Sequence, residues 1–548
     1  MSSNAKYFSS CFEIVACGGE GYNVAKGRFE MEQRSRELEE AKRIAALGGG
    51  EQRIAKQHEK GRLFARERIE LLVDPGSFVE WNMLVQHHPG APGDGIVTGY
   101  GTIEGRTICL FSQDSTVLAG SIGPLHGYKM YRTVERALDM GVPLIGLFDS
   151  PGARAGRMDQ PNAWDAAQAR DEKCGNSIFF PNTQASGVIP QISAVLGSCA
   201  GISVYSPALT DFVFMVDGIS HMFITGPRIV RSVMGEDISM EELGGAKVHA
   251  RLSGVCDFRV KSEVDCFQKI RQLLSFLPAN NRQAPPLITN DDEPDRREDE
   301  LATIVPTDPH KPYDMHEVIV RLVDNGDFLE VKEEFAPEII VGFARLAGYA
   351  VGIVANQPMV RAGSLTIDSS DKQARFMRFC DCFNIPLILL VDTPAYAPGS
   401  GQEHGGIIRH GAKVLYALCE AMVPRIAVVI RKAYGGGNLG MGVLPGLGTD
   451  FVFAWPIAEI GTLGAEQAVD LFHAEDIKRA PEPEQFRAQK IREYRERYAN
   501  PLAVASKSTH IDDVIGPGDT RWQLIKTLEL LRNKKVARYP KRHGNIPV

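Results

Sequence analysis

The sequence predicts an α/β fold in two tandem copies, on three observations. Apolar runs of strand length, such as Val142–Phe148 and Ile385–Val391, alternate with glycine-rich turns and helical stretches, the pattern of domains built on a largely parallel sheet. The 548-residue chain is too long for one ordinary domain. Short motifs of the first half also recur in order in the second half, so we expect each half to fold as one such domain.

The recurring motifs lie roughly 240 residues apart, the spacing of whole domains rather than of solenoid repeats. The tripeptide Ala119–Ser121 recurs at 362–364, and the Asp-Ser-Pro at 149–151 recurs as Asp-Thr-Pro at 392–394. Thr210–Phe214 recurs letter for letter at 449–453. A series this consistent indicates that the chain contains its own duplication.

The composition changes along the chain suggest four parts. We expect an N-terminal helical extension over residues 1–80, a first α/β domain over 81–285 and a second over 304–548. Between the two domains, residues 286–303 are rich in Asp, Glu and Arg. Such a segment cannot bury enough apolar area to fold alone and is expected to be an exposed linker.

Charge and hydropathy exclude several function classes. The formal net charge of −7 provides no basic field for nucleic acid. No apolar run is long enough for a membrane span, and the first residues do not resemble a secretion signal or an Arg-rich transit peptide. The scattered cysteines are typical of reduced thiols in the cytoplasm, and their spacing predicts no metal site.

Two glycine turns stand at equivalent places in the two halves. Cys199–Ser203 and Ala433–Asn438 each follow an apolar strand and precede an expected helix. Backbone N–H groups at such a turn converge on one point beside a helix N-terminus, which is the arrangement of donors in an oxyanion hole. The alternative is a tight turn that uses glycine only for its positive φ. Two oxyanion holes would suit a reaction with two enolate-like intermediates.

Other classes of enzyme have weak support in the sequence, or none. Gly435-x-Gly437-x-x-Gly440, with Glu459 farther on, fits a dinucleotide fingerprint and keeps an NAD-dependent oxidoreductase as a distant alternative. The equivalent turn of the first half lacks this pattern. No phosphate loop for ATP occurs and no Ser-His-Asp arrangement can be assigned. The histidines in glycine-rich or helical stretches are interpreted as structural or surface residues, namely His126, His249, His404 and His410.

A series of motifs resembles the biotin-dependent carboxyltransferases, and the β subunits of propionyl-CoA carboxylases most of all. The resemblance runs from about residue 35 to residue 548. The motifs that carry it are Ala65–Leu72, Asp74–Phe78, Gly93–Gly101, Ser186–Ile192, Tyr205–Phe212, Glu241–Ala246, Ser253–Val255, Ser369–Lys372, Phe383–Pro386, Gln402–Lys413, Arg431–Gly436 and His543–Pro547.

The resemblance implies two crotonase-type domains per chain and a homohexamer. It implies an acyl-CoA held mainly by the first half of one subunit and biotin held mainly by the second half of another. Biotin, carried by a separate subunit or domain, would release CO₂ and remove the α-proton of the acyl-CoA. The expected partners are a biotin carboxylase with its biotin carboxyl carrier, or a membrane decarboxylase subunit if the transfer runs in reverse. No metal is expected.

Site residues follow from the resemblance position by position. Gly201 and Ile202 would hold the thioester oxygen, and Gly436 and Gly437 the ureido oxygen of biotin. The family usually has a second glycine where Ile202 stands, so a backbone N–H is retained but close approach is lost.

Further departures border the substrate site. The family's Ser-Gly-Gly-Ala-Arg is Ser-Pro-Gly-Ala-Arg here, which makes Gly152, Ala153 and Arg154 candidate substrate-binding residues. Propionyl-type members have Asp at the position of Leu439, near the acyl chain, and their Pro-Gly-Phe is Pro-Ala-Tyr at 394–396. We therefore expect a carboxyltransferase for propionyl-CoA or for another acyl-CoA.

Overall fold

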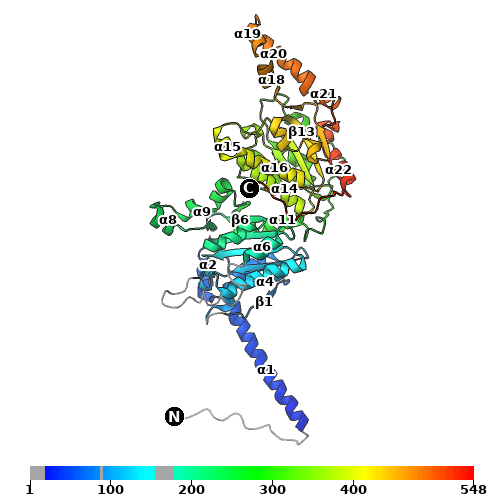
Figure 1. Cartoon of the computed structure of the whole chain (residues 1–548). Coiled ribbons are helices and arrows are strands. Elements are labelled where there is room, and N and C mark those ends of the chain that lie inside the picture. Colours follow the sequence, from blue (N-terminus) through cyan, green and yellow to red (C-terminus); the bar gives the residue numbers. More distant parts are fainter. Residues whose placement is uncertain (1–18, 87–89, 155–177) are drawn as a thin grey trace.

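The computed structural model describes residues 19–86, 90–154 and 178–548, and it places two α/β halves one after the other (Figure 1). Helix α1 projects away from the body of the molecule. Helix α3 instead packs into the first half, where it buries Ala65, Arg68, Ile69 and Leu72. The N-terminal helices are α1 (Gly19–Ala46), α2 (Glu51–His58) and α3 (Ala65–Leu72).

The first half is built on one sheet with strand order β1-β2-β3-β4-β5-β6-β8, and β7 pairs with the far end of β5. The pairs β1-β2 and β2-β3 are antiparallel and the rest are parallel. The strands are β1 (Val79–Trp81), β2 (Ile96–Ile103), β3 (Arg106–Gln113), β4 (Leu144–Ser150), β5 (Gln191–Ala200), β6 (Phe212–Val216), β7 (His221–Phe223) and β8 (Phe258–Val260). The helices are α4 (Pro124–Met140), α6 (Phe179–Ala185), α7 (Tyr205–Leu209), α8 (Pro227–Met234), α9 (Met240–Gly244), α10 (Ala246–Val248) and α11 (Glu263–Phe276).

The second half repeats this topology, with strand order β9-β10-β11-β12-β13-β14-β16 and β15 paired with the far end of β13. The strands are β9 (Phe328–Val331), β10 (Ile339–Leu346), β11 (Tyr349–Asn356), β12 (Leu387–Thr393), β13 (Arg425–Tyr434), β14 (Phe451–Ala454), β15 (Glu459–Gly461) and β16 (Asp513–Val514). The helices are α12 (Leu301–Ile304), α13 (Met315–Leu322), α14 (Ile367–Cys382), α15 (Ser400–Gly405), α16 (Ile407–Glu420), α17 (Gly435–Gly440), α18 (Ala465–Phe472), α19 (Ala474–Arg479), α20 (Pro483–Tyr494), α21 (Pro501–Ala505) and α22 (Thr520–Leu531).

The duplication extends to the register of the sheets. Ser150 of β4 pairs with Cys199 of β5, and Thr393 of β12 pairs with Ala433 of β13, each just after a register shift. The short turns before α4 and α14 match as well. Residues 118–120 have φ of 48°, 55° and 71°, and residues 361–363 have φ of 49°, 54° and 76°. The equivalence expected from the sequence thus holds down to single backbone angles.

Helices α3 and α13 are counterparts in this duplication. Arg271 of α11 donates to the carbonyl of Leu72, which ends α3, at 2.8 Å. Arg521 of α22 donates to the carbonyl of Leu322, which ends α13, at 2.7 Å. Each arginine also binds the aspartate two residues on, Asp74 or Asp324. Helix α3 therefore belongs structurally with the first α/β half.

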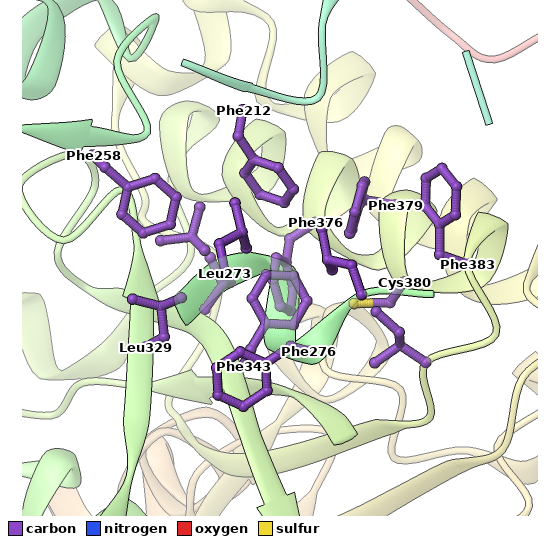
Figure 2. Packing of buried hydrophobic residues seen from close by; sticks show 14 of the residues in the cluster. Phe212, Phe258, Leu273, Phe276, Leu329, Phe343, Phe376, Phe379, Cys380 and Phe383 are labelled. Carbon is purple, nitrogen blue, oxygen red and sulfur yellow. The ribbon is translucent and has the colours of Figure 1, made fainter. Parts of the chain in front are cut away.

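A continuous apolar core joins the two halves (Figure 2). The ring of Phe212 in β6 lies 4.6 Å from that of Phe379 in α14 and 5.9 Å from that of Phe343 in β10. Phe276 of α11 stacks 6.0 Å from Phe343. Because this interface is apolar and packed like a domain interior, it fixes the orientation of one half on the other.

Two helical arms leave the body of the molecule (Figure 1). One contains α8 and α9 and follows β7; the other contains α18 to α20 and follows β15. Across the described residues, none of the helices is long and apolar enough to cross a bilayer.

Candidate functional site

Both predicted glycine turns lie at the carboxyl end of a central parallel strand. The first continues from β5 into a short 3₁₀ turn, η4 (Gly201–Val204), and the second continues from β13 into α17. Gly201 has φ of 60° and Gly435 has φ of 49°, so each turn opens with one left-handed glycine. The N–H groups that follow lack carbonyl partners within their own helix because they begin it. Both turns therefore present donors where an oxyanion could bind.

Gly152 supports the first turn directly. It has φ of 103°, and a Cβ there would lie 2.5 Å from the carbonyl oxygen of Ala200, so only glycine fits. The same Cβ position is 3.8 Å from the nitrogen of Ile202. Ala153 forms a parallel bridge to Ile122, in which Ile122 N–H donates to the Gly152 carbonyl at 2.8 Å. The loop after β4 thus packs against the first glycine turn.

The guanidinium of Arg154 is held by protein groups. It donates to Asp94 Oδ1 at 2.7 Å and to the carbonyl of Ser121 at 2.9 Å. Asp94 is completely buried and also accepts from the N–H of His126 at 2.8 Å. The structure thus directs the donors of Arg154 toward other protein groups.

The end of β12 and the loop that follows it pack against the second turn. A Cβ on Gly437 would lie 3.0 Å from Thr393 Cγ2, and one on Gly436 would lie 3.2 Å from the ring of Tyr396. Gly440 faces the same ring. Leu439 of α17 keeps 37% of its surface exposed. The structure therefore brings Gly436, Gly437 and Leu439 together on one short helix.

A cavity of about 280 Å³ opens beside this second turn. Its walls include Tyr434, the last residue of β13, and Pro394 of the loop that supports α17. Ala362, in the strained left-handed turn before α14, also lines it. Non-glycine residues with such φ angles are strained and cluster at functional sites. In the sequence, the alanine repeated at 119 and 362 indicates only the duplication; its left-handed φ is visible only in the structure.

Each half buries one aspartate near its glycine turn, Asp149 in the first half and Asp392 in the second. The N–H of Asp149 donates to Gln113 Oε1 at 2.9 Å, and the N–H of Asp392 donates to Asn356 Oδ1 at 3.1 Å. Both carboxylates are paired with cations, Asp392 with Arg431 at 3.0 Å. The sequence shows the repeat of these aspartates but does not indicate a role for them.

The buried lysines bind backbone carbonyls of the protein itself. Lys129 donates to the carbonyls of Gly93 and Ile96 at 2.9 and 2.5 Å, and its counterpart Lys372 donates to that of Phe335 at 2.8 Å. Burial lowers the pKa of each lysine to about 8. Burial also lowers the pKa of His126 to about 3, so this imidazole is neutral at physiological pH.

Two other sequence hypotheses can be compared with the geometry. Glu459 accepts a hydrogen bond from the hydroxyl of Tyr434 at 2.6 Å and pairs with Arg495 at 3.2 Å. The acidic residue of the dinucleotide fingerprint is therefore already bound by other protein side chains. In the described ranges 19–86, 90–154 and 178–548, no three His, Cys, Asp or Glu side chains come together as a metal site.

Comparisons with known proteins agree with this architecture. The sequence profile of the carboxyl transferase domain matches residues 56–546. The propionyl-CoA carboxylase carboxyltransferase subunit of Haloferax mediterranei is 48% identical, over 94% of this chain and all of that one. The methylmalonyl-CoA decarboxylase subunit alpha of Veillonella parvula is 47% identical, over 91% and 96% of the two chains.

A solved structure extends the comparison to the fold. A transcarboxylase 12S crystal structure, described as a hexamer with methylmalonyl-coenzyme A and methylmalonic acid bound, superposes with a TM-score of 0.89 at 45% identity. The match covers 94% of this chain and 98% of that chain. The expected fold, two tandem crotonase-like domains, is thereby confirmed. With its duplicated sheets, its paired glycine turns and these matches, the chain belongs to the carboxyl transferase family.

Proposed function

We propose that this carboxyltransferase moves CO₂ from carboxybiotin to the α-carbon of an acyl-CoA such as propionyl-CoA. The observation that carries the proposal is the pair of equivalent turns, because the transfer generates negative charge on two oxygens, one on each substrate. The relatives that support it include propionyl-CoA carboxylase subunits from Haloferax mediterranei and Roseobacter denitrificans.

The proposed roles are those that the family resemblance assigns, and the turn geometry is consistent with them. The N–H groups of Gly201 and Ile202 donate to the thioester oxygen, and those of Gly436 and Gly437 donate to the ureido oxygen of biotin. Biotin, when bound, supplies the CO₂ and a nitrogen base for the α-proton. The chain itself orients the two substrates, excludes water and stabilises charge, which fits the neutral, buried state of His126.

The biotin of this reaction is proposed to be carried by another subunit. The nearest match to a Met-Lys-Met acceptor is Tyr128-Lys129-Met130. Lys129 is 1% exposed and its Nζ is bound by two carbonyls, so a biotinylating enzyme cannot reach it. The proposed partner is a biotin carboxylase with its carrier domain, and a streptavidin blot of the purified chain should be blank.

The active assembly is proposed to be a homohexamer. The elements packed on η4 are α7, β5 and β7, whereas those packed on α17 are α16, β12 and β13, so each turn is built by its own half. Both helical arms expose apolar side chains, among them Val233 at 72% and Phe472 at 66%. The hexamer described for transcarboxylase 12S supports this proposal.

A transfer assay with free carboxybiotin and propionyl-CoA tests the proposed reaction. Carboxylated product at a rate that depends on both substrates is expected; no transfer to any short acyl-CoA by the intact oligomer contradicts it. The decarboxylase relatives make the reverse direction the second candidate. Co-purification separates the two, because a biotin carboxylase indicates carboxylation and a membrane decarboxylase subunit indicates decarboxylation.

A further inference from the structure

The two halves supply the cation for their buried aspartate from opposite sides. Asp149 is 4% exposed and Asp392 is fully buried, each one residue before the end of its strand. In the second half, Arg431 of the neighbouring strand β13 donates its Nε to Asp392 at 3.0 Å. By the register described above, the counterpart of Arg431 in β5 is Gly197. The first half therefore has no side chain at the position that neutralises the aspartate in the second half.

The segment before the first sheet provides the missing cations. Arg62, in the loop that leads into α3, and Arg68, within α3, both donate to the Asp149 carboxylate, Arg68 at 3.2 Å. Both also donate to the carbonyl of Leu196 in β5, at 3.0 and 2.9 Å. Arg68 further forms a bidentate pair with Glu263 of α11, at 2.8 and 2.9 Å.

The counterpart segment of the second half has no arginine at the position of Arg68. Because Leu72 and Leu322 end the equivalent helices, the position of Arg68 in α3 corresponds to Val318 in α13, a fully buried core residue. The loop before α13 accepts from Arg431 instead, through the carbonyls of Asp308 at 2.9 Å and Lys311 at 2.8 Å. The direction of donation between loop and strand is thus reversed between the halves.

The Asp149 carboxylate, which the two arginines neutralise, lies against β5. This strand leads into the first glycine turn (the acyl turn, proposed to bind the thioester oxygen). A Cβ on Gly197 would be 2.1 Å from Asp149 Oδ1, so the carboxylate is pressed onto β5 four residues before Gly201. Three residues after Asp149, Gly152 packs on the carbonyl of Ala200. This carboxylate therefore contacts one of the two chain segments that form the turn and lies three residues before the contact made by the other.

We propose that Arg62 and Arg68 are positioning residues for the acyl-CoA side of the reaction, and that the chain before the first sheet is thereby part of that half-site. This rests on the proposed role of Gly201 and Ile202. Removing one partner of a buried ion pair leaves an uncompensated charge, and the structure relaxes to hydrate it. A shift of about 1 Å in a catalytic donor can cost about 10²-fold in rate.

The test compares Arg62→Met with Arg66→Met. The two arginines are four residues apart and almost equally exposed, at 18% and 19% of the side chain, but Arg66 pairs with Glu80. Each intact oligomer is measured in two assays. One is transfer from free carboxybiotin to saturating propionyl-CoA, and the other is carboxybiotin decarboxylation without acyl-CoA.

Arg62→Met should lower kcat for transfer by about 10- to 100-fold, while decarboxylation and the Kd for propionyl-CoA change less than about 2-fold. Arg66→Met should leave the ratio of the two activities unchanged. Arg62→Lys, which retains the charge, should recover part of the transfer rate. The mirror variant Arg431→Met should lower decarboxylation more than acyl-CoA binding.

Two results would overturn the inference. One is wild-type transfer in Arg62→Met, and the other is an equal loss in both assays, which indicates a general structural role. Arg68→Met extends the test if it assembles; because Arg62 is partly exposed, its variant remains informative if Arg68→Met does not fold. The variant Ile202→Pro distinguishes failure of this inference from failure of the proposed function on which it rests. If Ile202→Pro selectively impairs transfer but Arg62→Met does not, only the positioning role fails; if neither does, the assignment of the acyl turn fails.

Discussion

At the residue scale, the proposed chemistry depends on backbone donors rather than on side chains. Gly201 and Gly435 adopt left-handed angles that open the turns, and Gly152 leaves room for the carbonyl of Ala200. The side chain of Arg154 binds Asp94 and Ser121. Substitutions that remove an N–H are therefore more informative than those that remove a side chain.

Gly437→Pro should reduce carboxybiotin decarboxylation by about 10²–10³-fold, because proline removes one oxyanion donor. Gly437→Ala keeps the donor, and its Cβ would meet Thr393 Cγ2 at 3.0 Å, so a smaller loss is expected. Carboxybiotin decarboxylation without acyl-CoA measures this, with Tm and oligomer size as controls. Full activity in a well-folded Pro variant would show that the turn is only a turn.

Leu439→Asp should change acyl preference rather than overall activity. Leu439 is 37% exposed on α17 beside the proposed donors, and a carboxylate there changes the polarity of the neighbouring surface. Such pocket changes discriminate by about 1–3 kcal/mol. The measurement is kcat/KM across acyl-CoAs of increasing length. An equal loss on every substrate would assign Leu439 a structural role.

At the element scale, the two arms extend from the strands that flank the turns. Ala200, which precedes the first turn, pairs with Phe223 of β7, and α8 follows this strand. Tyr434, which precedes the second, pairs with Gly461 of β15, and α18 follows. Each arm therefore starts at the rim of a proposed half-site, where contact with another subunit would complete it.

Val233→Glu on α8 should weaken the assembly, because a carboxylate would enter an apolar contact. Ile229 and Val233 lie one helical turn apart and are 56% and 72% exposed. Light scattering should show loss of the hexamer, six chains of 60.1 kDa or about 360 kDa. Arg231→Glu, on the opposite face of the helix, is the control. A stable, active monomer of the wild-type chain would contradict both the hexamer and a site between subunits.

At the scale of the whole molecule, the junction of the halves combines an apolar core with a half-buried acid. Phe212 and Phe343 pack across the junction, and Asp211 adjoins this contact. Burial raises the pKa of Asp211 to about 7, although the Gln191 N–H and Arg375 favour its charged form. The folded pKa thus exceeds the ordinary value of 3.8, and the folded state binds the proton more tightly.

The stability provided by protonated Asp211 should therefore be lost as pH rises from about 4 to 7. Asp211→Asn is neutral at every pH, so its Tm should exceed that of the wild type increasingly over this window. Asp450→Asn is the control at the equivalent position. Asp450 pairs with Lys534 at 2.7 Å, so its loss should destabilise near neutral pH. A Tm difference for Asp211→Asn that is constant between pH 4 and 8 would contradict the raised pKa.

The duplication, the tandem α/β fold, the carboxyltransferase family and the place of both glycine turns could be predicted from the sequence alone. These depend on local patterns: apolar runs form buried strands, and a glycine after such a strand marks the turn that follows. Ala433 and Tyr434, assigned from the sequence to the second turn, are the last residues of β13. Strand ends are less certain because neighbouring strands extend or shorten them by pairing.

Which charged side chains pair with each other became visible only in the folded structure. Arg62 is 87 residues from Asp149 along the chain, and Arg68 is 195 residues from Glu263, separations at which no sequence period applies. The sequence showed a motif containing Arg68 and a repeated Asp-Ser-Pro motif. It did not show that Arg68 packs against the aspartate of the first copy of that motif. It also gave no sign that the cation changes sides between the halves, because burial requires only that each aspartate be paired, from whichever element reaches it.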